Sequence, residues 1–308
     1  ATLYRYATPT DIAIISVASV CSIASGAALP LMTIIFGGLQ GVFQKYLVTA
    51  ELTYQGFLDE MVTFVLYFVY LAIGTFCVTY VSTVGFIYTG EHISAKIREK
   101  YLESCLRQNI GFFDKLGAGE VTTRITSDTN LIQDGISEKV ALTLSALATF
   151  ISAFVIGFVK YWKLTLILLS TVVALLLNMG GGSTFIMKYN KQSLEAYAQG
   201  GSLADEVISS IRNAVAFGTQ ERLARQYDDH LKKAEFFGFR VKSAIACMIA
   251  GMMMVLYLNY GLAFWQGSKF LIDGETSLSN ILTILMAVMI GAFNLGNVAP
   301  NLQAFTNA

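Results

Sequence analysis

Charged positions divide the chain into uncharged stretches that are long enough to cross a membrane. Six stretches contain no Asp, Glu, Lys or Arg, and they are residues 12–44, 61–90, 140–159, 164–187, 243–268 and 276–308. The shortest is 20 residues long, and a helix needs about 20 apolar residues to cross the hydrocarbon core of a bilayer. Buried helices of a soluble core would show shorter runs, and transmembrane strands would need short alternating segments. The pattern predicts an all-α membrane protein with six transmembrane helices.

Composition narrows the expected chemistry. Of the 308 residues, 55% are hydrophobic and only 14% are charged, whereas about a quarter of the residues of a soluble domain are charged. The 21 basic and 21 acidic residues cancel, so nucleic acid is not an expected partner. The four cysteines and two isolated histidines show no metal-ligand spacing, and no phosphate-binding loop of the Gly-x-x-x-x-Gly-Lys-Ser/Thr type occurs. We therefore expect no catalytic, cofactor-binding or metal-binding residue in this chain.

The distribution of lysine and arginine predicts an orientation. Residues 91–139, residues 188–242 and Arg5 together carry 17 basic residues, and the loops on the other side carry four. Since basic loops stay in the cytoplasm, the pattern predicts an integral, multi-pass protein with both ends cytoplasmic.

The two long inner connections predict rigid helical hairpins. Neither contains proline, and both keep apolar residues at helical spacing. We therefore expect helices near residues 11–44, 57–108, 129–159, 164–210, 221–272 and 277–308, several of which extend beyond the membrane. A docking surface for another domain would explain two matched hairpins, and a solvated helix pair without a partner is the alternative.

No Asp, Glu, Lys, Arg or His interrupts the six stretches, which disfavours ion-driven carriers and voltage sensors. The membrane helices contain no site that could couple an energy source to transport, and they are attached to two rigid hairpins. This suggests that another domain supplies the energy for movement. A channel or regulated membrane module, in which the hairpins bind a regulator, is an alternative of another class.

Several strings resemble one family of transporters. They are Phe112–Asp114, Gly119–Ile125, Trp162–Thr165, Asp205–Arg212, Ala216–Gln220 and Ile290–Phe293. In this order they resemble the first transmembrane domain of B-type ABC exporters, the P-glycoprotein group, from Tyr4 to Ala308. Gly85–His92 and Asn109–Glu120 are most similar to fungal multidrug and leptomycin B resistance pumps.

The resemblance implies a single transmembrane domain over residues 1–308 of a longer, ATP-hydrolysing efflux pump. The partners it implies are nucleotide-binding domains, a second six-helix domain, the lipid bilayer of the plasma membrane, and apolar small-molecule substrates. ATP and Mg²⁺ would bind in the nucleotide-binding domains of the parent protein and not in this chain, which holds no ATPase residues. A narrow-specificity exporter of a peptide, lipid or similar cargo has the same fold and remains an alternative.

Aromatic residues and methionines that recur on one face of a predicted helix, here called stripes, predict a substrate cavity. Tyrosines at mid-membrane depth need partners for their hydroxyl groups, and methionine can repack around unlike ligands. Packing between helices is the alternative role for every stripe. For Asn297, the alternative is a hydrogen bond between helices. The predicted cavity residues are Met32, Phe36, Gln40, Met253, Tyr257, Tyr260, Phe264, Met286, Met289, Ile290, Phe293 and Asn297.

Two further sets complete the predictions. By resemblance, coupling helices lie near residues 112–126 and 210–218, with Phe113, Asp114, Glu120, Thr123, Arg124, Arg212, Ala216, Phe217 and Gly218 as contact residues. Proline lacks a backbone donor and glycine weakens a helix, so hinges are predicted at Pro30, Gly180, Gly181, Gly182 and Pro300. Static shape is the alternative for each hinge.

Overall fold

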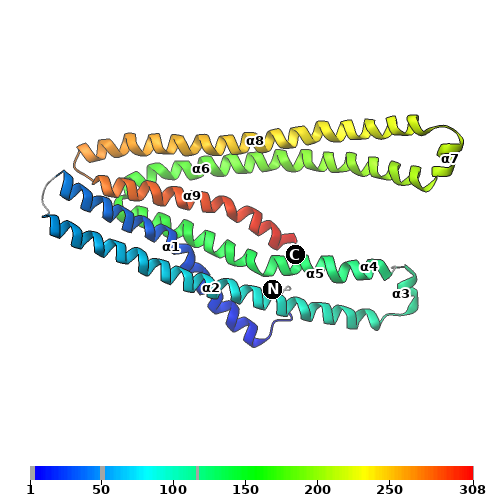
Figure 1. The fold of residues 1–308 in the computed structure, drawn as a ribbon, viewed down its shortest axis with the longest axis horizontal. Coiled ribbons are helices and arrows are strands. Elements are labelled where there is room, and N and C mark those ends of the chain that lie inside the picture. Colours follow the sequence, from blue (N-terminus) through cyan, green and yellow to red (C-terminus); the bar gives the residue numbers. More distant parts are fainter. Residues whose placement is uncertain (1–3, 49–52, 116–117, 308) are drawn as a thin grey trace. The chain divides into compact units, whose positions relative to one another are not determined.

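A computed structural model describes residues 4–48, 53–115 and 118–307 of the chain. Every regular element in these ranges is helical (Figure 1). The elements are α1 (Pro9–Leu47), α2 (Tyr54–Leu106), α3 (Ile110–Lys115), α4 (Ala118–Thr123), the π-helical turn η1 (Arg124–Asp128), α5 (Thr129–Ile136), α6 (Glu138–Ser209), α7 (Ile211–Ala216), α8 (Gln220–Ile272) and α9 (Leu278–Asn307).

The long helices confirm the prediction of an all-α membrane protein. Within the described residues, five helical segments are long and apolar enough to cross a membrane. One of them contains α6, whose backbone leaves the helical region at Tyr161 (φ −164°, ψ 103°). Two uncharged stretches lie on either side of this residue. The number of six transmembrane helices stays a prediction.

The chain divides into two compact units. Unit 1 comprises residues 1–169 and 262–308, and unit 2 comprises Ser170–Gly261. Alanines take part in both buried clusters between the helices of unit 1. Ala18, Phe86 and Ala141 form one buried cluster, and Ala153, Ile156 and Ala287 form another. Small side chains let helix backbones approach closely, as is typical of helix pairs in membranes.

A backbone contact joins α1 to the first part of α6 at Gly26. A side-chain carbon on Gly26 would lie 2.2 Å from the carbonyl oxygen of Ser145, so only glycine fits. The Gly26 carbonyl also lacks its usual helical donor, because residue 30 is proline. Thr149 replaces that donor, and its buried hydroxyl donates a hydrogen bond to the Gly26 carbonyl over 2.7 Å.

A second glycine joins α1 to α9. A side-chain carbon on Gly37 would lie 1.8 Å from Oγ1 of Thr283, and the Ser279 hydroxyl donates to the Gly37 carbonyl. The packing of these helices therefore depends on hydroxyl groups and on a glycine, which has no side chain to keep the helices apart.

The start of α1 is fixed by a buried carboxylate. Asp11 is 1% exposed and accepts hydrogen bonds from the Thr8 backbone (2.8 Å) and hydroxyl (2.5 Å). Nδ1 of His92 on α2 lies 2.9 Å from its Oδ1. Burial raises the pKa of Asp11. The hydrogen bonds from Thr8 and His92 lower this pKa by more than burial raises it, so the net shift is downward. This group precedes the uncharged stretch that begins at Ile12.

Charged and aromatic side chains join the turn within α6 to the turn between α8 and α9. Lys163 Nζ lies 2.7 Å from Oε2 of Glu275, Tyr161 donates to the same carboxylate, and the Tyr161 and Phe270 rings meet edge to face at 5.2 Å. The hydrogen bonds from Lys163 and then Tyr161 lower the pKa of Glu275. These bonds hold the two turns of unit 1 together.

Unit 2 is an antiparallel pair formed by the second part of α6 and most of α8. The Thr171 hydroxyl donates to Oδ1 of the buried Asn259 over 2.8 Å. The Asn178 amide donates to the Met248 carbonyl over 2.9 Å. At the far end, α7 connects the two helices, and Gly218 (φ 63°) makes the turn into α8.

Candidate functional site

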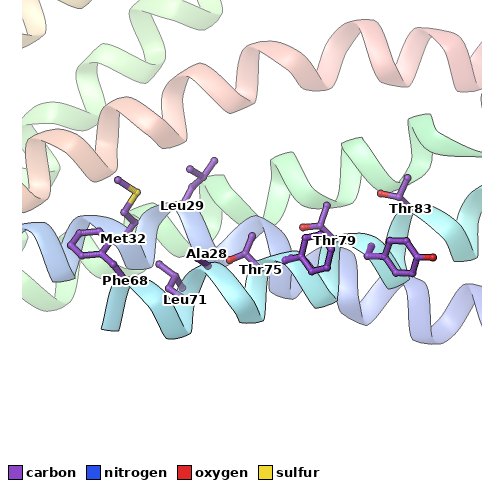
Figure 2. A pocket seen from close by; sticks show the side chains of 11 residues that line it. Ala28, Leu29, Met32, Phe68, Leu71, Thr75, Thr79 and Thr83 are labelled. Atoms are coloured by element: carbon purple, nitrogen blue, oxygen red, sulfur yellow. The ribbon is translucent and has the colours of Figure 1, made fainter. Parts of the chain in front are cut away.

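An apolar pocket lies between α1 and α2 in unit 1. Its volume is about 710 Å³, within the range of small-molecule sites. Figure 2 shows side chains of α2 in a row from Phe68 to Thr83, with Leu29 and Met32 contributed by α1. The wall is formed by Ala28, Leu29, Met32, Phe68, Leu71, Ala72, Thr75, Phe76, Thr79, Tyr80 and Thr83.

The periodicity of α2 explains this wall. Thr75, Thr79 and Thr83 recur every four residues, as do Phe68, Ala72, Phe76 and Tyr80, so two neighbouring stripes follow one face of the helix. The hydroxyls of Thr79 and Ser25 share a hydrogen bond of 2.7 Å between the two helices. The pocket is therefore apolar with a few hydroxyl groups that could orient a ligand.

Of the predicted cavity residues, only Met32 lines this pocket. The other two predicted residues of α1, Phe36 and Gln40, are half-buried in the same unit. Oε1 of Gln40 is buried and has no hydrogen-bond partner among the described residues. The contribution of α2 was missed, although its four-residue spacing of threonine and aromatic residues could have been found in the sequence.

The predicted stripe on α8 points away from the α6 contact of unit 2. Met253 is 44% exposed and Tyr257 is 71% exposed, whereas Asn259, on the opposite face, is buried against Thr171. Tyr260 is half-buried within unit 2, and Phe264, in unit 1, is exposed.

The predicted stripe on α9 borders a buried face. Ile284, Ala287 and Val288 are fully buried in unit 1, and Met286 is exposed beside them. Met289, Ile290 and Phe293 are half-buried. The side chain of Asn297 lies outside the described residues. The assignment of these residues to a substrate cavity stays a prediction.

Short helices form the tips of both hairpins. In the first hairpin, Phe113, Thr123 and Arg124 are exposed on α3, α4 and η1, and the side chains of Asp114 and Glu120 lie outside the described residues. In the second, Arg212, Ala216 and Phe217 are exposed around α7, and Phe217 reaches 80% exposure.

Comparison with known proteins identifies the family. Residues 15–293 match the ABC transporter transmembrane region. The chain belongs to this family.

Similar proteins include several fungal transporters. The chain is 63% identical over 306 residues to the ABC multidrug transporter atrD of Emericella nidulans, a match that covers 99% of this chain and 23% of that protein. It is 60% identical to the ABC multidrug transporter mdr1 of Aspergillus fumigatus, with the same coverage of each chain. It is also 60% identical to the ABC multidrug transporter MDR2 of Trichophyton tonsurans, over 100% of this chain and 23% of that protein. The chain thus spans about a quarter of the length of these relatives.

Within this ABC transmembrane domain, the predicted hinges lie in continuous helices. Pro30 is buried inside α1, and α6 runs through Gly180, Gly181 and Gly182 without a break. Apart from its own helix backbone and chain neighbours, no described atom lies within 4 Å of a side-chain carbon placed on Gly180 or Gly181. The backbone at Pro300 is helical, and its side chain lies outside the described residues. Bending at these positions stays a prediction.

Proposed function

We propose that this chain forms one membrane half of an ATP-driven efflux pump that exports apolar, structurally diverse compounds by alternating access. The observation that carries this proposal is 58–63% identity, over nearly the whole chain, to proteins named as fungal ABC transporters, most of them multidrug transporters. ATP and Mg²⁺ would bind in nucleotide-binding domains of the parent protein. The remaining partners in the proposal are a second six-helix domain and the plasma membrane, with both chain ends cytoplasmic.

The chemistry of the exposed stripes supports a polyspecific cavity. Burial of apolar surface needs no fixed geometry, so it can hold unlike compounds. The methionines and aromatic rings of α8 and α9 offer such surface, and Tyr257 and Tyr260 add hydroxyl groups that can bond with a ligand. The pocket lined by Met32 and Phe68 offers a second apolar surface in unit 1.

The two hairpins would carry the motion of the nucleotide-binding domains to the membrane helices. α8 is 53 residues long, which corresponds to about 80 Å of helix, and its uncharged stretch occupies only residues 243–268. The exposed Phe217 at the tip is a large apolar side chain suited to docking into another domain. This chain contributes binding and motion to the proposed cycle and no step of hydrolysis.

The first test is ATP hydrolysis by the intact protein in lipid, measured with and without a panel of unrelated apolar compounds. The proposal expects stimulation by several of them. Steady hydrolysis that ignores the panel would support the narrow-specificity exporter. Passive flux without any nucleotide requirement would overturn the pump in favour of a channel.

Variants locate the cavity and the coupling contact. Tyr260→Ala and Phe293→Ala are expected to change which compounds stimulate hydrolysis, while basal hydrolysis persists. Leu258→Ala is the control, because Leu258 is exposed on α8 outside the stripe. Phe217→Ala is expected to abolish stimulation by every compound. Unchanged selectivity in both cavity variants would show that the cavity is misplaced.

A further inference from the structure

The membrane boundary of unit 2 carries only positive charge. Lys188 and Lys191 follow the uncharged stretch of α6, and Arg240 and Lys242 precede that of α8. Residues 164–194 and 236–272 contain no Asp or Glu. The other long hairpin differs, because Glu91 and Glu138 stand at its boundary among the basic residues.

Helix register places these four cations at one level of the hairpin. The Arg240 guanidinium lies 5.4 Å from the centre of the Tyr189 ring, so this level of α8 meets the level of α6 that carries Lys188. One turn further along α6, the Ser193 hydroxyl donates to the Ala234 carbonyl on α8. The basic residues of both helices therefore form a cluster that surrounds the pair at one level, where the uncharged stretches end. Arg240 and Lys242 lie on opposite sides of the buried Val241.

The cations of this cluster are exposed and lack strong counter-charges. Among the described residues, Lys188, Arg240 and Lys242 make no ion pair, and Lys191 has only a 4.0 Å contact with the exposed Glu195. Further from the membrane on α8, Lys232 pairs closely with a carboxylate. The neighbouring cations at the boundary raise the local positive potential, because only Lys191 has an acidic side chain in contact with it among the described residues.

Aromatic rings hold the arginine in place. Arg240 lies 4.3 Å from the centre of the Phe236 ring in addition to its contact with Tyr189. Cation–π contacts fix the guanidinium and leave its edge donors free. A guanidinium with free donors can bind a phosphate through two parallel hydrogen bonds, and nearby lysines add point charges.

We propose that this cluster, formed by Lys188, Lys191, Arg240 and Lys242, binds headgroups of anionic phospholipids of the cytoplasmic leaflet. Charge complementarity and position carry the proposal. The cluster lies where the uncharged stretches end, which is the depth of the lipid phosphates. This binding goes beyond the proposed transport and requires neither ATP nor a transported compound.

The test measures lipid retention by the intact protein. It is reconstituted in phosphatidylcholine vesicles that contain a minority of phosphatidylserine, then extracted, and the phosphatidylserine that remains bound is quantified by mass spectrometry. The cluster variant carries Lys188→Gln, Lys191→Gln, Arg240→Gln and Lys242→Gln. The matched control carries Arg222→Gln, Arg225→Gln, Lys232→Gln and Lys233→Gln, which removes the same charge from α8 about 14 Å or more beyond Lys242.

The wild type and the control are expected to retain phosphatidylserine. The cluster variant is expected to lose retention about fivefold for each neutralised cation. Equal loss in the control would overturn the proposal, because it would indicate diffuse attraction to the whole hairpin. Displacement of the lipid by excess inorganic phosphate would also overturn it, in favour of a site for free anions.

A folding check keeps the result interpretable. Thermal unfolding in phosphatidylcholine alone should be the same for both variants. If the fourfold variant unfolds, Lys188→Gln with Lys242→Gln replaces it, and that pair should still lower retention more than tenfold. Full retention in the folded double variant would refute the site. The measurement uses no nucleotide, so its failure leaves the proposed pump untouched.

Discussion

Thr149 is expected to stabilise the contact between α1 and α6 by replacing a missing backbone donor. Its hydroxyl donates to the Gly26 carbonyl over 2.7 Å, and Pro30 cannot supply the N–H that would otherwise reach that oxygen. Thr149→Val keeps the shape and removes the hydroxyl. A buried carbonyl without a partner costs about 1–3 kcal/mol in soluble proteins, and hydrogen bonds between membrane helices average about 0.6 kcal/mol. We expect a loss of about 1 kcal/mol in the free energy of unfolding, measured by detergent-induced unfolding in mixed micelles.

A control and a double-mutant cycle isolate this effect. Thr143→Val is the control, because the Thr143 hydroxyl donates only to the Lys139 carbonyl of its own helix. Pro30→Ala restores a backbone N–H beneath the Gly26 carbonyl, so Thr149→Val should cost less in that background. A cost for Thr149→Val that equals that of Thr143→Val, or one that Pro30→Ala leaves unchanged, would refute the reasoning.

Three further predictions concern the same helices. Asp11→Asn should lower stability by about 1–2 kcal/mol at neutral pH. Because the folded-state pKa of Asp11 is lowered, its stabilisation is present above the unfolded value near ~3.9 and is lost as the pH falls through the folded value. Melting curves of the two proteins should therefore converge in acid. Gly37→Val should cost about 1–3 kcal/mol, measured by unfolding, because its side chain would overlap Thr283. Gly180→Ala with Gly181→Ala should stabilise the helix by up to ~1 kcal/mol per residue, seen as a higher melting temperature, and should slow the proposed drug-stimulated hydrolysis; an unchanged rate would contradict a hinge.

The helices could be predicted from the sequence wherever charge marks their course through the membrane. The uncharged stretch 243–268 and the helical spacing on its N-terminal side predicted a helix near residues 221–272, and the structure has Gln220–Ile272. The local sequence pattern does not predict a helix boundary that is set by a contact with a residue far away in the sequence. The prediction of one helix over residues 129–159 did not include the break at Ser137 (ψ −119°). That break accompanies close packing of Ser137 against Gly90 of α2.

The candidate site was less predictable for the same physical reason. A stripe on one helix shows which side chains share a face, and it does not show which helix covers that face. Met32 was singled out by its stripe, yet its neighbours in the pocket come from α2. The contact between Asp11 and His92 was also missed, since the two residues lie 81 positions apart. Pairings of this kind arise from the three-dimensional fold.

Apolar exposure alone does not mark a binding surface in a membrane protein, because lipid and protein are equally apolar surroundings. Phe76 and Tyr257 are 72% and 71% exposed in the structure, but the two side chains differ at their tips. A phenylalanine ring is satisfied by lipid, whereas a tyrosine hydroxyl at mid-depth needs a bonding partner. Tyr257 lies well inside the uncharged stretch 243–268. The polar tip, more than the area of the ring, is therefore the feature that favours a cavity or a partner helix over lipid at this face of α8.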